Sequence, residues 1–222
     1  MCGIAAIFAY RSTAPPVDRG EIERITEWMR PRGPDAGGTW IADDGRVALG
    51  ARRLAIIDLS SEGNQPFFDA EGEYAIVFNG EIYNHREIRR SLERSGARFH
   101  SASDTEVVLQ LYRRDGPHML GLLRGMYALA IWEVRTRRMF VARDPCGIKP
   151  LYYADDGRTI RIASEVKALL AGGSVPRSRD AAGTAGFFLT GSVPEPFTTV
   201  TAVRALEAGH AFFVGEDRGR SA

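Results

Sequence analysis

The chain has 222 residues, 44% hydrophobic and 26% charged, a composition typical of a soluble globular protein that can bury a core. Its 29 Lys and Arg residues balance 28 Asp and Glu residues, which excludes the basic face needed for nucleic acid or an anionic membrane. No apolar run approaches the ~20 residues of a membrane-spanning helix, and two cysteines are too few for a disulfide framework.

These features favour a cytoplasmic protein in a reducing environment. The first residues lack the basic segment of a secretory signal. The four histidines are scattered without metal-ligand spacing, so we expect no metal site.

The first third of the chain contains short apolar runs around one amphipathic segment. Residues 3–10 predict a buried strand, and residues 18–29 predict a helix with one apolar face. Residues 46–58 predict two strands or one long bent strand. Residues 73–78 predict a further strand, which runs straight into Asn79-Gly80-Glu81.

Two helices follow, and each has a capping signal. The first is expected to end at Gly96 and the second to span residues 105–114. The capping pairs are Asn84 with Glu87 and Ser103 with Glu106.

The remaining elements are mostly hairpins. Residues 126–133 and 138–142 predict one hairpin, and residues 152–154 and 159–163 predict another. A helix is expected over 165–171.

The composition then changes to Gly, Ser, Pro and Arg, which indicates a domain boundary at about 172–180. The last forty or so residues predict one short helix and one short strand. The tally of antiparallel-looking strands with helices between them indicates an α+β fold.

Cys2 directly follows the initiator methionine, and removal of Met1 would leave it as a free amino terminus. A thiol of pKa ~8.5 needs a base near neutral pH, and an α-amino group of pKa ~7.7–8.0 can supply one from the same residue. Position alone also fits a small buried side chain at the start of a strand. The other motifs decide between the two interpretations.

Several motifs occur together in one order, and together they resemble the amino-terminal glutaminase domain of class II glutamine amidotransferases. The closest resemblance is to the asparagine synthetase branch. The motifs are MCGIAAIF at the start, RGPD at 32–35, RRLAIIDLS at 52–60, QP at 65–66, FNGEIYNH at 78–85, SDTEV at 103–107 and RDPCGIKPLYY at 143–153. This resemblance implies an amino-terminal-nucleophile hydrolase fold, an αββα sandwich of two antiparallel sheets between helical layers.

The resemblance also implies roles for individual residues. Cys2 would be the nucleophile, and the Asn79 side chain with the Gly80 N–H would hold the oxyanion, although Asn-Gly alone also fits a tight turn. Arg53 would bind the α-carboxylate of glutamine and Asp104 its α-ammonium, although Asp104 also suits the first turn of a helix. The remaining pocket residues would be Leu54, Ala55, Ile56, Ile57 and Glu81.

Three other residues are given no part in the chemistry. Arg52 is interpreted as a solvated or structural charge and Cys146 as a structural thiol. Pro31 stands where the family usually has histidine, which affects the conformation of the adjacent RGPD loop and not the nucleophile.

Asparagine synthetases carry a second domain that uses ATP and magnesium to amidate aspartate. Its Ser-Gly-Gly-x-Asp-Ser loop does not occur here, so no cofactor is expected in this chain. We expect residues 1–175 to form the glutaminase domain and residues 176–222 a segment leading towards a synthetase domain or subunit. The apolar residues of that segment would then be unpaired, because their partner surface is absent; they are Phe187, Phe188, Leu189, Phe212 and Phe213.

The expected activity is therefore the glutaminase half of an asparagine synthetase-like ligase in amino-acid biosynthesis. Two alternatives stay open. The chain could be a glutamine-binding or regulatory module without chemistry, or the amidotransferase half of a synthetase with a different acceptor.

Overall fold

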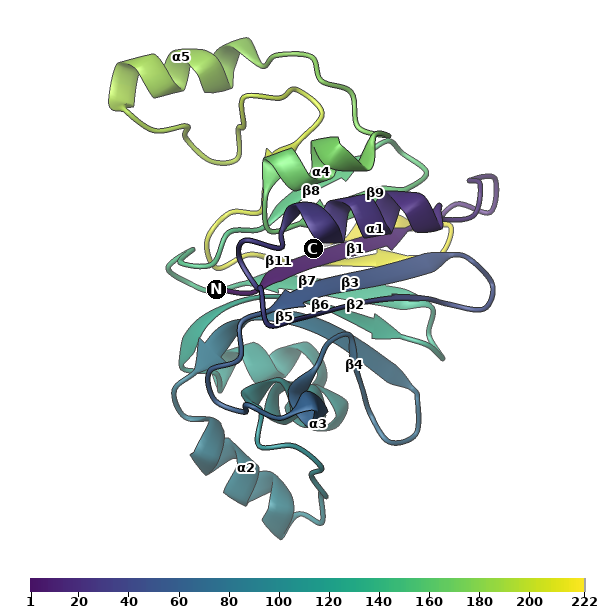
Figure 1. Cartoon of the computed structure of the whole chain (residues 1–222), viewed down its shortest axis with the longest axis vertical. Helices are drawn as coiled ribbons and strands as arrows, with labels where there is room; N and C mark the ends of the chain where they lie inside the picture. Colours follow the sequence, from purple (N-terminus) through teal and green to yellow (C-terminus); the bar gives the residue numbers. More distant parts are fainter. Residues whose placement is uncertain (222) are drawn as a thin grey trace.

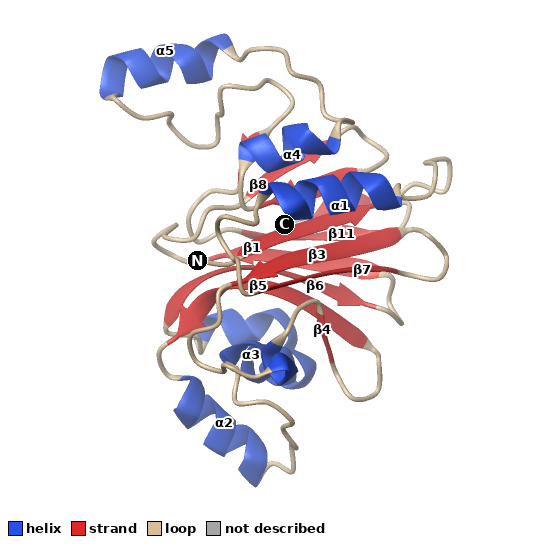
Figure 2. Cartoon of the chain, viewed as in Figure 1, coloured by secondary structure: helices blue, strands red, loops and turns tan. Residues whose placement is uncertain are grey.

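Residues 1–221, which the computed structural model describes, form two stacked six-stranded sheets with helices on both outer faces (Figure 1, Figure 2). The strand order is β10-β8-β9-β1-β3-β2 in the first sheet and β12-β11-β7-β6-β5-β4 in the second. Every pairing within the sheets is antiparallel. The α+β class and the expected αββα layering are confirmed.

Each sheet combines strands from distant parts of the sequence. The first contains β1 (Gly3–Phe8), β2 (Ala36–Ile41), β3 (Val47–Arg53), β8 (Tyr152–Asp155), β9 (Ile160–Ala163) and β10 (Arg204–Ala205). The second contains β4 (Phe67–Phe68), β5 (Tyr74–Ile82), β6 (Gly125–Glu133), β7 (Arg138–Arg143), β11 (Ala211–Gly215) and β12 (Gly219–Ser221).

The helices form the outer layers. The first sheet is covered by α1 (Arg19–Trp28) and α4 (Val166–Gly172), and the second by α2 (His85–Arg94) and α3 (Asp104–Asp115). Helix α5 (Ala181–Thr190) stands away from both sheets at the top of Figure 1.

Side-chain alternation along the strands divides the core into layers. The residues of β1 that enter the core between the sheets are Ile4, Ala6 and Phe8, and those of β5 are Ala75 and Val77. The intervening residues of β1 pack against α1 and those of β5 against α3. Alternate residues of β1 and of β5 therefore face the space between the two sheets.

Strand β2 was not predicted, because its Ala-Gly-Gly start has low strand propensity. The structure pairs it with β3, and backbone approaches closely at Gly38. A Cβ on Gly37 would lie 2.6 Å from the Arg52 guanidinium, and one on Gly38 would lie 2.6 Å from the carbonyl oxygen of Gln65. The run 46–58 resolves into β3 and a long loop.

The two predicted capping pairs both differ from the structure. The Asn84 side chain bonds the backbone of Leu122 and Arg124 at 3.0 Å each and does not cap α2. Ser103 does cap α3, by accepting from the Thr105 N–H, but the Glu106 carboxylate turns away to the backbone of His100 and Ser101. In each pair one side chain bonds a partner outside its own helix, which the spacing of the pair does not reveal.

The last forty residues contain α5 and three short strands, where one strand was predicted. Strand β10 pairs with β8, and β11 pairs with β7. Phe212 is consequently buried in β11 and Phe213 is half-buried against the second sheet, so the expectation that both are unpaired was wrong. The domain boundary at 176 stays a prediction, although strands on its far side extend both sheets.

Candidate active site

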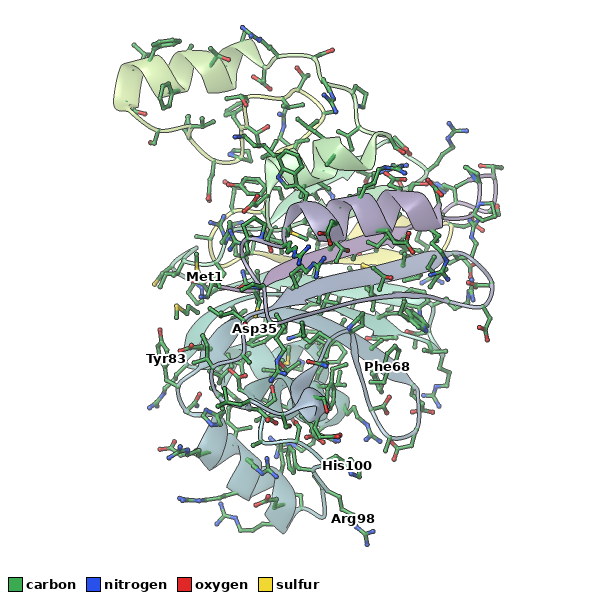
Figure 3. The ribbon with its side chains drawn as sticks, viewed as in Figure 1. Met1, Asp35, Phe68, Tyr83, Arg98 and His100 are labelled. Atoms are coloured by element: carbon green, nitrogen blue, oxygen red, sulfur yellow. The ribbon has the colours of Figure 1, made fainter. Side chains whose placement is uncertain are left out.

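The alternation of β1 and β5 brings Cys2 and Asn79 to the same space. Cys2 lies two residues before Ile4, and Asn79 lies two residues after Val77, so both follow the register that faces the inter-sheet core. In Figure 3, Met1 and Tyr83 mark the side of the sandwich where β1 begins and β5 ends.

A cavity of about 280 Å³ opens there. Its walls come from the start of β1, the loop after β3, the end of β5, the start of α3 and the loop after β7. The lining includes Cys2, Arg53, Leu54, Ile56, Ile57, Asn79, Gly80, Glu81 and Asp104. The structure therefore brings together every predicted site residue except Ala55, whose N–H instead donates to Asp35 at 2.9 Å.

Cys2 directly precedes β1 and is partly exposed, and its thiol faces the backbone of Leu54. The Leu54 N–H donates to Cys2 Sγ at 3.5 Å. On the other side, the Arg32 Nε donates to the Cys2 carbonyl oxygen at 3.0 Å, and Arg32 pairs with Glu165 at 3.1 Å. The backbone of the nucleophile candidate is thus held while its sulfur remains accessible from the cavity.

Asn79 is almost fully buried, with 1% of its surface exposed, and its Nδ2 has no hydrogen-bond partner. A buried amide donor without a partner lowers the stability of the folded state by about 1–3 kcal/mol, so such donors are rare and often serve a function. Gly80 follows on β5, where a Cβ would lie 2.6 Å from the Met126 carbonyl oxygen and 2.6 Å from the Phe78 ring. Asn79 Nδ2 is available to an acceptor atom placed in the cavity.

Arg53 ends β3 and organises the loop that follows. Its Nη1 donates to the Ser60 carbonyl oxygen at 2.7 Å and to Asn64 Oδ1 at 3.0 Å, and its Nη2 donates to the Asp58 carbonyl oxygen. These bonds use three of the five N–H groups of a guanidinium. Because Arg53 also lines the cavity, the remaining donors can meet an anionic group there.

Asp104 and Glu81 add two carboxylates to the lining of the cavity. Asp104 is the first residue of α3 and accepts the Ile82 N–H on Oδ2 at 3.0 Å. Burial raises the pKa of the Asp104 carboxyl, and the negative charge of Glu81 raises it further, against the opposing effects of the Ile82 N–H and of His85. A cationic ligand group between these carboxylates would relieve the unfavourable charge.

The loop over 32–35 braces the loop after β3. The Asp35 N–H donates to the Arg53 carbonyl oxygen at 3.1 Å, and Asp35 Oδ2 accepts the Ala55 N–H. Gly33 makes this approach possible, since a Cβ there would lie 2.4 Å from the Arg52 carbonyl carbon and 2.5 Å from the Arg53 nitrogen.

Gly33→Ala is accordingly expected to lower the free energy of unfolding by about 1–3 kcal/mol, because backbone atoms must move apart to admit the methyl group. Urea unfolding measures the change. Gly121→Ala is the matched control, because nothing lies within 4 Å of the position a Cβ would take there. Equal stability of the two variants would contradict this account of the loop.

The sequence did not predict that Gln65 and Lys149 border the cavity, and Lys149 was expected only to shape its turn. Gln65 accepts the Phe78 N–H at 2.7 Å and lies 3.3 Å from Thr105, so it ties β5 to α3. Lys149 is buried beside Ile148, at the end of a loop whose N–H groups converge on Asp144. Gln65 lies in the QP motif and Lys149 in the RDPCGIKPLYY motif, so membership of these motifs was the sequence feature that could have indicated them.

Arg52 and Cys146 lie outside the cavity. Arg52 forms an ion pair with Glu27, in line with a structural charge. The Cys146 thiol is exposed, so it is not packed as a structural side chain, and that interpretation was wrong.

Two classes of feature are not found in residues 1–221. No group of three or more His, Cys, Asp or Glu side chains in this range could hold a metal ion. None of the helices in the same range is long and apolar enough to cross a membrane.

Comparison with known proteins places the chain among amidotransferases. It is 38% identical over 219 residues to glutamine-hydrolysing asparagine synthetase 1 of Bacillus subtilis, covering 98% of this chain and 34% of that protein. It is also 38% identical over 184 residues to the amidase chry2 of Gibberella zeae, covering 79% of this chain and 27% of that protein. It therefore spans about a third or less of the length of these relatives.

A solved structure shows the same fold. Glutamine phosphoribosylpyrophosphate amidotransferase from Bacillus subtilis matches with a TM-score of 0.73 at 22% identity, over 99% of this chain and 48% of that chain. This likeness confirms the expected amino-terminal-nucleophile fold. The glutamine amidotransferase domain profile matches residues 1–221, and the chain belongs to that family of class II glutamine amidotransferases.

Proposed function

We propose that this chain hydrolyses glutamine to glutamate and ammonia, with Cys2 as the nucleophile. The observation that carries the proposal is the shared cavity: the Cys2 sulfur and the partnerless Asn79 amide nitrogen border the same space. One group can attack an amide carbon there while the other receives its oxygen.

Recognition of free glutamine is assigned to the charged residues of the cavity. The α-carboxylate binds the unused donors of Arg53, and the α-ammonium lies between Glu81 and Asp104. The Leu54–Ile57 segment contributes the remaining wall through Leu54, Ile56 and Ile57. A ligand with both charges and a side-chain amide satisfies all of these groups at once.

The first step requires that Met1, which also borders the cavity, has been removed. The freed α-amino group of Cys2 takes the thiol proton, and the sulfur attacks the amide carbon, forming an S–C bond. The carbonyl electron pair moves to oxygen, which Asn79 Nδ2 and the Gly80 N–H stabilise. Collapse of this intermediate breaks the C–N bond, and the leaving nitrogen takes the proton from the α-amino group and departs as ammonia.

The second step reverses the roles. The α-amino group takes a proton from water, the resulting hydroxide attacks the thioester carbon, and the same donors hold the oxyanion. The C–S bond then breaks, glutamate leaves, and the sulfur recovers its proton. No other base is required of the chain.

The wider setting is also part of the proposal. Residues 1–175 carry the glutaminase site, and residues 176–222 lead towards a synthetase domain or subunit that uses ATP and magnesium. Similarity to an asparagine synthetase supports aspartate as the acceptor, and similarity to an amidase supports keeping a different acceptor as the alternative. A reducing cytoplasmic location suits a thiol nucleophile.

The test is glutamate release from glutamine by the purified chain after intact mass has verified loss of Met1. Release without ATP or a second protein supports the proposal. Glutamine binding by calorimetry with no glutamate formed would contradict it and leave the non-catalytic glutamine-binding module.

Asp104→Asn is expected to raise KM for glutamine by about 30-fold or more, because a desolvated partner of the α-ammonium is lost. In the wild type, kcat/KM should fall on the acid side as the α-amino base of Cys2 is protonated, and fall further as the Asp104 carboxylate takes up a proton with an apparent pKa above the ordinary ~3.9 of aspartate. The variant should keep the first of these two losses and lack the second.

Asp104→Asn should weaken glutamine binding but increase the stability of the fold. Because folding raises the pKa of Asp104, the protonated form favours the folded state and stability falls as pH rises through that pKa. Asp104→Asn should therefore raise the melting temperature at pH 7. Asp115→Asn is the control: Asp115 lies on the surface beside Arg114, which lowers its pKa, so that substitution should leave KM unchanged and not raise stability.

A further inference from the structure

The loop between β3 and β4 surrounds the end of the Arg53 side chain. Three of its groups accept hydrogen bonds from the guanidinium: the carbonyl oxygens of Asp58 and Ser60 and the side-chain oxygen of Asn64. Gly63 lies against the same group, since a Cβ there would lie 2.5 Å from Arg53 Nη2. The position of Arg53 in the cavity therefore depends on the position of this loop.

The Asp58 side chain joins this loop to the segment before α3. Its Oδ1 accepts the Ser60 N–H at 2.8 Å and the Ser60 hydroxyl at 2.6 Å, both within the loop. Its Oδ2 accepts the Ala102 N–H at 2.8 Å, two residues before Asp104 at the start of α3. One carboxylate thus connects the segment that holds Arg53 to the segment that leads into Asp104.

These bonds require an ionised carboxylate. Asp58 is buried and borders the cavity. The Ser60 hydroxyl holds the pKa of the Asp58 carboxyl below its usual range, against the effect of burial, and the two N–H groups and the Arg53 charge act in the same direction as the hydroxyl. A carboxylate accepts on both oxygens, whereas an amide accepts on one. Asparagine at this position could therefore keep the bonds to Ser60 or the bond to Ala102, but not all of them.

We propose that Asp58 is a positioning residue that sets the separation of the two charged ends of the glutamine site. Free glutamine carries its α-carboxylate and α-ammonium on one carbon, so the groups that bind them must lie at a fixed separation. Under the proposed glutaminase function, on which this inference rests, those groups are Arg53 and Asp104. By joining their segments, Asp58 gives the site its selectivity for the zwitterionic amino acid over amides that lack either charge.

The reacting groups are held by other elements. Cys2 directly precedes β1, and Asn79 lies on β5. The side-chain bonds of Asp58 go to the loop after β3 and to the segment before α3. Loss of Asp58 should therefore weaken the binding of glutamine and change the chemical step little.

The test measures ammonia release by the wild type and by Asp58→Asn from three amides. They are glutamine, glutaramate, which lacks the α-amino group, and γ-aminobutyramide, which lacks the α-carboxylate. We expect Asp58→Asn to raise KM for glutamine by about 10-fold or more and to keep kcat within about 3-fold. The kcat/KM for each analogue should change little, because each binds through only one charged end. The preference for glutamine should fall by about 10-fold or more.

The ratio between substrates separates positioning from a loss of folded protein, which would lower kcat/KM for all three amides by the same factor. An equal fall for all three, or no change in any, would overturn the proposal. Ser60→Ala is the second variant if Asp58→Asn does not fold. It removes only the hydroxyl bond to Asp58 and should lower the preference for glutamine by a smaller factor.

Asp156→Asn is the matched control. Asp156 Oδ1 also accepts two N–H groups, from Arg158 at 2.9 Å and Thr159 at 2.8 Å, in the turn between β8 and β9 outside the cavity. The substitution should lower stability and leave KM for glutamine and the preference for glutamine unchanged. A control that loses the preference as Asp58→Asn does would contradict the role of Asp58.

Calorimetric titration separates this inference from the glutaminase function. In the Cys2→Ala background, Asp58→Asn should weaken glutamine binding by about 10-fold or more and leave the affinities of the two analogues nearly unchanged. If the wild type binds glutamine but releases no ammonia, the glutaminase function is refuted, and these affinities still decide the role of Asp58. Equal glutamine affinity with and without Asp58→Asn would refute that role while leaving the glutaminase function intact.

Discussion

Cys2→Ala is expected to abolish glutamate release, with a loss of at least about 10⁴-fold in kcat, because the thiol that forms the acyl intermediate is removed. The free α-amino group and the Asn79 donor remain in this variant, so glutamine should still bind with little change in affinity. Glutamate release and calorimetric titration with glutamine measure the two effects separately.

Cys146→Ala is the matched control, because it removes the other thiol in the chain, and that thiol is exposed outside the cavity. It should retain full activity. Loss of activity in Cys146→Ala, or turnover by Cys2→Ala at the wild-type rate, would contradict the assignment of the nucleophile.

Asn79→Ala is expected to lower kcat by about 10²–10³-fold, since one oxyanion donor is removed, with KM nearly unchanged. Its effect on folding should be small. The Asn79 Nδ2 is buried without a partner, so its loss relieves a desolvation cost that offsets the void left by the smaller side chain. We expect the free energy of unfolding to stay within about 1 kcal/mol of wild type.

Asn84→Ala is the control, because it should change stability and not kcat. Both polar atoms of the Asn84 amide are bonded, to Leu122 and Arg124, so its removal should lower stability and leave kcat unchanged. If Asn79→Ala instead loses stability and keeps kcat, Asn79 is a structural residue and the oxyanion assignment fails.

Local signals predicted most of the helices and strands. The apolar run of β1, the hairpin of β6 and β7 and the amphipathic helix α1 were expected within a few residues of their bounds, because burial periodicity is a property of each segment. Strand β2 was missed, since its backbone is held by β3 and Gly38 lies close to the carbonyl oxygen of Gln65, neither of which is visible in the local sequence.

Side-chain partners were harder to predict than elements. Glu106 had the spacing of a capping box with Ser103, yet its carboxylate accepts from His100 and Ser101. The loop before α3 passes close to Glu106, and the better-placed N–H groups take its oxygens. The spacing of Ser103 and Glu106 takes account only of the helix terminus and not of the loop that passes beside it.

The sequence alone determined which chemistry is available: a cysteine at position 2, the Asn79-Gly80 pair after a strand, and Arg53 and Asp104 within ordered motifs. Residue type sets nucleophilicity, charge and hydrogen-bonding capacity, and these do not depend on the fold. Tertiary structure decided the rest. Two strands far apart in sequence reach the same end of the sandwich, which leaves Asn79 Nδ2 buried and unpaired and places Glu81, Asp104 and Arg53 in the lining of one cavity. Burial and pairing arise only between segments in contact, so only the folded chain could establish them.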